Sequence, residues 1–354
     1  MDYNVSVIIP IFNVEFYIER CLQSLINQSI GFENLEVILI DDVSTDNTRY
    51  IIEKYAEKYD NIRYCFLKEN SGAAGKPRNT GLEMASADYV MFLDPDDFLA
   101  HDACEVLYDK ITSENVDIVS GIYAIKDKED NYIPYPNLWA TTITDPCISR
   151  EEKNRIVKEL LEKNNYEIRL DSYKDMNSII RNFGGISKIY SLKLIREKNL
   201  SFPVNIPAQD SVFLYEFFLN ASGILFIDNI VYYYDNNRYE KVNESMKYQV
   251  NVKRNSDRLS AYKLILDISR KHDNVENFAY YLLSGKLEFY LDRFIVYTNL
   301  SRDEIKQSLD GYYELFDLVY ESDYKIQDKF VAIFEKIHER DIDGAIDYIF
   351  TIRK

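Results

Sequence analysis

The stretch ADYVMFLDPDDF, residues 87–98, joins an apolar run to three carboxylates, Asp94, Asp96 and Asp97. The apolar run predicts a buried strand, because an uninterrupted run of this length suits a strand covered on both faces. The carboxylates at its end would repel one another and raise each other's pKa if nothing positive met them. A divalent cation is the simplest positive partner, since Mg²⁺ and Mn²⁺ prefer carboxylate oxygens. An acidic turn that caps the next helix is the alternative.

Outward from this strand, the first third of the chain alternates apolar strands with helical patterns. Strands are expected at 5–12, 35–42 and 62–67, helices at 15–29 and 49–59, and a loop at 70–81 that leads into a short helix. Apolar strands that alternate with helices predict a mostly parallel α/β sheet with helices on both faces. Ligands bind such sheets outside the carboxyl ends of the strands. Those ends carry PIFN, DDVSTD, the Gly-rich loop and DPDD, so we expect the site there.

The rest of the chain is less regular and then helical. The pattern predicts a strand at 116–125, a polar loop or lid at 126–150, mostly helix from 150 to 200, a helix at 207–221, one or two strands at 223–235 and helices beyond about 245. We therefore predict a domain at 1–240, with halves at 1–115 and 116–240, and a helical domain at 241–354.

Composition excludes several classes of protein. The chain has 354 residues, 46% of them hydrophobic, and a formal charge of −17, which argues against nucleic-acid binding. Its four cysteines form no CxxC pair and its three histidines no HExxH, so zinc and haem signatures are absent and free thiols in a reducing compartment are expected. We expect neither a signal peptide nor a membrane span, because the most apolar stretch, 217–234, is interrupted by polar residues.

Two further motifs have both a chemical and a structural interpretation. The loop 70–81 has the wrong spacing for a P-loop, and Pro77 follows Lys76 where a Ser or Thr would bind the metal. Its backbone and the cations Lys76 and Arg78 can approach a diphosphate, and an ordinary solvated loop is the alternative. Asp210 begins a helix with an apolar face, where it is either a functional carboxylate or a first-turn acid that the helix dipole stabilises.

Taken together, the motifs resemble one known family. The segments 5–13, 35–48 and 70–98, followed by 186–203 and 208–218, occur in the order typical of the family 2 glycosyltransferases of the GT-A fold. The arrangement NSG, PRNTG and FLDPDD looks most like bacterial enzymes that glycosylate wall teichoic acid and related cell-surface polymers. The resemblance implies a Rossmann-like GT-A sheet in 1–240 followed by the C-terminal helical region.

The resemblance also implies roles for individual residues of this chain. Asp96 would ligate Mn²⁺ or Mg²⁺, and Asp210 would be the catalytic base. Gln209 departs from the family pattern, in which an acidic residue often precedes that aspartate, and Glu216 is the substitute candidate for the base. Val43 and Pro95 are tolerable variants. The nucleotide-sugar, most simply a UDP-sugar, would be bound by Pro10, Phe12, Asp42, Asn70, Arg78 and Asp94.

These roles predict an inverting transfer to a hydroxyl of a cell-surface polymer or lipid-linked glycan. A metal at Asp96 would offset charge on the departing UDP, and Asp210 would deprotonate the acceptor. A cytoplasmic protein, meeting the inner face of the membrane through its acceptor, is expected, and the C-terminal helices would bind acceptor or form a homo-oligomer. A sugar-phosphate nucleotidyltransferase and a catalytically silent GT-A binding or scaffold protein are the alternatives; donor sugar, acceptor and linkage cannot be read from the residues.

Overall fold

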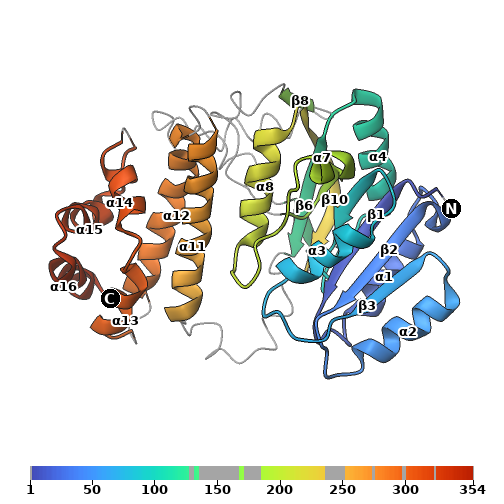
Figure 1. The fold of residues 1–354 in the computed structure, drawn as a ribbon, viewed down its shortest axis with the longest axis horizontal. Coiled ribbons are helices and arrows are strands. Elements are labelled where there is room, and N and C mark those ends of the chain that lie inside the picture. The colour runs from blue at the N-terminus through green and yellow to red at the C-terminus, as the bar shows by residue number, and fades with distance from the viewer. Residues whose placement is uncertain are drawn as a thin grey trace. The chain divides into compact units, whose positions relative to one another are not determined.

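The structure is a computed structural model that describes residues 2–126, 131–134, 167–170, 185–235, 252–272, 276–296, 300–322 and 324–353. The chain divides into two compact units. The first unit holds a sheet with its helices, and the second holds the helices from α11 to the C-terminus (Figure 1).

The first unit is built on one β-sheet. In the described residues its strands lie in the order β3-β2-β1-β4-β9-β6-β10-β5, with β7 paired to β6 and β8 paired to β10. The strands are β1 (Val5–Ile11), β2 (Leu35–Asp41), β3 (Ile62–Phe66), β4 (Tyr89–Phe92), β5 (Phe98–Leu99), β6 (Ile118–Lys126), β7 (Tyr132–Pro134), β8 (Glu167–Leu170), β9 (Lys188–Ser191) and β10 (Ile224–Tyr234). The helices are α1 (Ile18–Ile26), α2 (Thr48–Lys58), α3 (Gly75–Met84), α4 (Ala103–Glu114), α7 (Leu192–Glu197) and α8 (Gln209–Asn220), with a short 3₁₀ helix at Phe32–Asn34.

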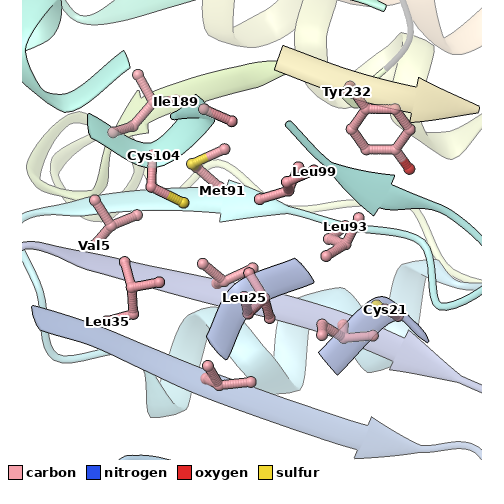
Figure 2. Packing of buried hydrophobic residues seen from close by; sticks show 14 of the residues in the cluster. Val5, Cys21, Leu25, Leu35, Met91, Leu93, Leu99, Cys104, Ile189 and Tyr232 are labelled. Carbon is pink, nitrogen blue, oxygen red and sulfur yellow. The ribbon is translucent and has the colours of Figure 1, made fainter. Parts of the chain in front are cut away.

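The N-terminal half of the sheet is parallel, as the sequence predicts. Strand β1 lies between β2 and β4, and all seven residues of β1 and of β2 are buried. Alternate residues of β1, such as Val5 and Ile9, pack into a core with the buried faces of α1 and α4, where Leu25 and Cys104 lie (Figure 2). Beyond β4 the sheet is mixed, because β9 runs antiparallel to both β4 and β6.

The opposite face of the sheet carries a second, aromatic cluster. Phe92 of β4 and Tyr190 of β9 meet edge to face, with ring centroids 5.6 Å apart. Phe213 of α8 packs against both rings and stacks on Phe202, 4.0 Å away. Phe217, one helical turn later, contacts Tyr190 at 5.2 Å. Buried aromatic pairs contribute beyond their area, so this cluster holds α8 on β4 and β9.

Several predicted elements differ from the structure. The helix expected after the loop 70–81 already begins at Gly75, so Arg78 lies inside α3. Mostly helix was expected from 150 to 200, yet Glu167–Leu170 and Lys188–Ser191 are strands; both pair with other strands, a contact that helical periodicity in the sequence does not reveal. The predicted loop or lid at 126–150 includes β7, and the rest of it, 127–130 and 135–150, lies outside the described residues. The segment 223–235 forms one strand, β10.

All the secondary-structure elements that the structure describes in the second unit are helices, as predicted. It contains α11 (Val252–Lys271), α12 (Glu276–Val296), α13 (Arg302–Leu309), α14 (Tyr313–Tyr320), α15 (Asp328–His338) and α16 (Ile342–Ile352). A capping box formed by Ser301 and Glu304 begins α13, which satisfies backbone donors at the helix start. Glu288 is buried and accepts hydrogen bonds from Tyr324 and Gln327, which ties α12 to the segment before α15.

Among the helices that the structure describes, none is long and apolar enough to cross a membrane. Cys21, Cys65 and Cys104 are free thiols, and the first and last of them are buried, in agreement with the sequence; Cys147 lies outside the described residues.

Candidate functional site

The predicted site residues of the first third gather at one edge of the parallel strands. Phe12 directly follows β1 and is 43% exposed, whereas Pro10 is buried within β1 opposite Ile40. Asp42 follows β2, and its backbone N–H donates to the carbonyl of Ile11 at 2.7 Å. The carboxylates of Asp94 to Asp97 follow β4. Because β1, β2 and β4 are mutually parallel, their carboxyl ends meet, as the sequence predicts.

The loop after β3 is tied to the end of β2 through Asp42. The Asp42 carboxylate accepts from the backbone N–H of Ser71 at 2.9 Å and from its hydroxyl at 2.9 Å. The Asn70 side chain donates to the backbone carbonyl of Asp42 at 2.7 Å and accepts from the N–H of Gly72. Val43, between Asp42 and Ser44, has a φ of 67°, a left-handed conformation that strains a β-branched residue. These contacts make a preformed rim beside Phe12.

Arg78 and Asp94 form a partly buried ion pair across the site. The guanidinium of Arg78 donates to the Asp94 carboxylate at 2.7 Å, and the Arg78 side chain is 7% exposed. The same guanidinium lies over the ring of Phe202, 5.4 Å from its centroid. The positive partner of Asp94 in the chain itself is therefore an arginine, for which the sequence predicts phosphate binding.

Asp97 is a structural residue of the acidic turn. It is 1% exposed, accepts from the Tyr232 hydroxyl at 2.6 Å and accepts from the backbone N–H of Asp235 at 2.8 Å. Burial, and then the charges of Asp94 and Asp96, raises the pKa of Asp97 to about 8. The turn does not cap the next helix, since the N-cap of α4 is Asp102. Neutralising Asp97 relieves part of the repulsion for which the sequence suggests a cation.

The raised pKa of Asp97 predicts a pH dependence of stability. Because its pKa is higher in the folded than in the unfolded chain, the contribution of Asp97 to the free energy of unfolding is fully present below about pH 4 and is lost as the pH rises through about 8. We expect Asp97→Asn, which stays neutral, to lose less stability than the wild type over that window, by up to a few kcal/mol. Denaturant unfolding in metal-free buffer measures the free energy of unfolding of both proteins at each pH. If this free energy changed with pH equally in the two proteins, the assignment of the raised pKa to Asp97 would be contradicted.

The donor set of the acidic turn fits a hard divalent cation that is shared with a substrate. Asp94 and Asp96 are partly exposed, whereas both oxygens of Asp97 already accept hydrogen bonds. Within the described ranges no group of three His, Cys, Asp or Glu residues could hold a metal alone. Mg²⁺ and similar ions are commonly held by one or two carboxylates together with substrate phosphates and water. The turn thus suits an ion that phosphate oxygens help to coordinate.

Asp210 lies in the first turn of α8 and is partly exposed. Gly185 lies beside it, since a methyl group added at Gly185 would be 3.6 Å from the Asp210 Cβ. Glu216 is six residues further along α8, about 9 Å along the axis and on a different side of the helix. The two carboxylates therefore lie at different places on α8, and Asp210 is the one in its first turn. Gln209 is buried.

Three residues that the sequence analysis did not single out lie close to the candidate site residues. Tyr232 holds Asp97 and also accepts from the backbone N–H of Asp94. Arg20 pairs with Asp235, donates to the carbonyl of Asp96 at 2.6 Å and lies over the ring of Phe98. Lys188 is buried near Asp210. A lone lysine inside the apolar segment ISKIY was the one signal in the sequence that could have pointed to Lys188.

Comparison with known proteins gives the same fold. Residues 6–180 match the family model described as "Glycosyl transferase family 2". A poly(ribitol-phosphate) beta-glucosyltransferase of Bacillus spizizenii is 29% identical over 231 residues, which are 65% of this chain and 32% of that protein. This chain thus spans about a third of the length of that relative.

Solved structures extend the likeness over the whole chain. The structure of S. aureus TarS 1–349 in complex with UDP-GlcNAc has a TM-score of 0.74 at 24% identity and covers 100% of this chain and 92% of that one. A mannosyltransferase of Pyrobaculum calidifontis in complex with GDP-Man and Mn²⁺ has a TM-score of 0.54 at 15% identity, over 99% of this chain and 87% of that one. At these identities the likeness establishes the fold, and it confirms the predicted GT-A sheet followed by C-terminal helices.

Proposed function

We propose that this chain, which belongs to glycosyl transferase family 2 through residues 6–180, transfers a sugar from a UDP-sugar to a hydroxyl of a polyol-phosphate polymer of the cell surface. The observation that carries the proposal is the joint placement of Phe12, Asp42, the Arg78–Asp94 pair and Asp96 at the carboxyl edge of β1, β2 and β4. That edge is where α/β sheets bind nucleotides. The match to this family favours a glycosyltransferase over the nucleotidyltransferase alternative.

The donor nucleotide would lie along this edge. Phe12, which is exposed directly after β1, borders the base, and Pro10 lies two residues before it in β1. Asp42 accepts from the base, since a carboxylate that receives the Ser71 hydrogen bonds still has lone pairs for one more donor. Asp94 accepts from the ribose hydroxyls and is held in place by Arg78. Asn70 holds the rim through its hydrogen bond to the Asp42 carbonyl, and the phosphates would lie beside that rim.

Asp96 is the residue that would hold Mn²⁺ or Mg²⁺ together with the diphosphate. When bound there, such an ion offsets the negative charge that develops on the departing UDP. The chain's own contribution is a partly exposed carboxylate whose backbone carbonyl Arg20 anchors at 2.6 Å. The Pyrobaculum mannosyltransferase, solved in complex with GDP-Man and Mn²⁺, is consistent with this assignment for the fold.

Asp210 is the proposed general base. A single base is enough, because a leaving diphosphate needs no proton. Asp210 would take the proton of the acceptor hydroxyl as that oxygen attacks the anomeric carbon from the face opposite to UDP, which inverts the configuration. Asp210 lies in the first turn of α8, where the helix dipole interacts favourably with a carboxylate.

The acceptor class is proposed from the relatives. The Bacillus spizizenii relative is named for transfer to poly(ribitol-phosphate), and we propose a polymer or lipid-linked glycan of that kind for this chain, met at the cytoplasmic side of the membrane. The helices α11–α16 would bind that polymer or join two chains. Analytical ultracentrifugation of the full chain with and without polymer separates these roles, since a dimer without polymer supports the second.

A donor panel tests the proposal. The full chain is incubated with UDP-, GDP- and dTDP-sugars and poly(ribitol phosphate), with Mn²⁺ or with EDTA, and released nucleotide and modified polymer are measured. We expect one UDP-sugar to be consumed with Mn²⁺ and not with EDTA. Nucleotide release from every donor at the buffer rate, together with no calorimetric binding of UDP and Mn²⁺, would overturn the transferase and leave a catalytically silent protein of the same fold.

A further inference from the structure

Lys188 is a buried lysine and the first residue of β9. It is 3% exposed, and its ammonium group donates to the carbonyl of Ile186 at 3.1 Å. In the antiparallel pairing of β6 and β9 it stands opposite Ser120, which is 1% exposed. A buried ammonium ion is costly unless an opposite charge lies near it. A carboxylate close to Lys188 is therefore expected.

The helix and strand periods place Asp210 on the face that meets Lys188. Alternate residues of a strand share a face, so Lys188 lies on the same side of β9 as Tyr190. Residues three and seven apart share a side of a helix, so Asp210 lies on the side of α8 that carries Phe213 and Phe217. Those two rings pack on Tyr190 at centroid distances of 5.9 and 5.2 Å. The facing sides of α8 and β9 therefore carry Asp210 and Lys188.

Two further contacts bring the segment before β9 to Asp210. Gly185 lies against the Cβ of Asp210, within 3.6 Å of a methyl group that would be added there. The Tyr190 hydroxyl donates to the Gly185 carbonyl at 3.0 Å, while Lys188 holds the next carbonyl of the segment. Ser187, between them, has a φ of 59°, so the backbone turns sharply there. Lys188 and Tyr190 thus hold the backbone that packs on Asp210.

We propose that Lys188 is a positioning residue of the transfer reaction: its buried ammonium group forms an electrostatic pair with the Asp210 carboxylate across the facing sides of β9 and α8 and directs it toward the acceptor hydroxyl. This inference rests on the proposed role of Asp210 as base. Lys188 itself does not touch substrate in this assignment, because it is buried.

The electrostatics of the pair agree with this assignment. Burial lowers the pKa of Lys188 to about 8, and the charge of Asp210 opposes that change. The other titratable group on this face of β9 is Tyr190, whose pKa burial raises well above its ordinary value; Asp210 raises it further and Arg78 of α3 lowers it. Lys188 is therefore charged near neutral pH and loses its proton at moderately alkaline pH.

The pair can be measured without activity. Protein labelled with ¹³C at lysine side chains, with the Lys188 signal assigned by Lys188→Arg, is titrated by NMR as wild type and as Asp210→Asn. We expect the Lys188 signal to titrate near pH 8 in the wild type and about one pH unit lower in Asp210→Asn, because an attractive charge is lost. An unchanged midpoint would overturn the pairing, whether or not the chain transfers sugar.

Transfer kinetics test the positioning role. With a Lys188 pKa of about 8, only about a tenth of the wild-type molecules keep the charge at about pH 9, so the wild-type kcat should fall about tenfold between neutral pH and that pH. Lys188→Arg, whose charge persists, should keep its neutral-pH rate at alkaline pH, and Lys188→Met should be slow throughout with unchanged UDP affinity. An alkaline decline in Lys188→Arg equal to that of the wild type would overturn the role. If neither the wild type nor any variant transfers sugar, the proposed function is wrong. The NMR titration midpoints then test the Lys188–Asp210 pair by themselves.

Discussion

Asp210→Asn should reduce kcat for sugar transfer by about 10² to 10⁴-fold and leave the affinity for UDP unchanged. The amide is nearly the same size as the carboxylate and keeps the start of α8, where Asp210 is partly exposed. It cannot accept the proton of the acceptor hydroxyl, so the loss falls on the chemical step. Steady-state kinetics with a fixed acceptor, together with calorimetric titration of UDP, measure both quantities.

Glu216→Gln is the matched control for this variant. It makes the same chemical change on the same helix, but Glu216 lies about 9 Å along α8 and on another side. We expect Glu216→Gln to keep the wild-type kcat within about twofold, a difference of well under 1 kcal/mol in the barrier. A large loss in Glu216→Gln together with an active Asp210→Asn would reverse the assignment of the base.

Asp96→Ala should abolish the effect of Mn²⁺ on UDP binding and lower kcat/KM by about a hundredfold or more. The variant removes the partly exposed carboxylate that would share an ion with the diphosphate, whereas the backbone carbonyl that Arg20 holds remains. Calorimetry of UDP binding with Mn²⁺ and with EDTA gives the first quantity. We expect the wild type to bind UDP at least tenfold more tightly with Mn²⁺, about 1.4 kcal/mol, and the variant to bind equally in both buffers.

Asp102→Ala controls for the loss of one negative charge near the same turn. Asp102 is exposed at the N-cap of α4 and makes no side-chain cap hydrogen bond. We expect it to keep the Mn²⁺ effect and the wild-type kcat/KM. If Asp96→Ala responded to Mn²⁺ as Asp102→Ala does, Asp96 would not be the metal ligand and Asp94 would be the remaining carboxylate to change.

The sequence predicted the fold class well because its signals are local. The buried strand predicted at 35–42 has a continuous apolar run at 37–40, and the apolar residues of α8 recur at helical spacing over nearly the predicted range. The predicted GT-A fold is confirmed by the solved structures. Prediction failed at β9, whose four residues are too few for a period and whose antiparallel neighbours β4 and β6 are distant in the chain.

The edge at which the site lies also followed from local pattern, because the carboxyl ends of parallel strands must meet. What each carboxylate does there depends on side chains far away in the chain. Asp94 pairs with Arg78, whereas Asp97 is buried under Tyr232 and Asp235 and tends to stay neutral. Three acidic residues within four positions look alike in a sequence. Their burial and partners come from α3 and β10, and those contacts separate a pairing residue, a candidate metal ligand and a structural acid.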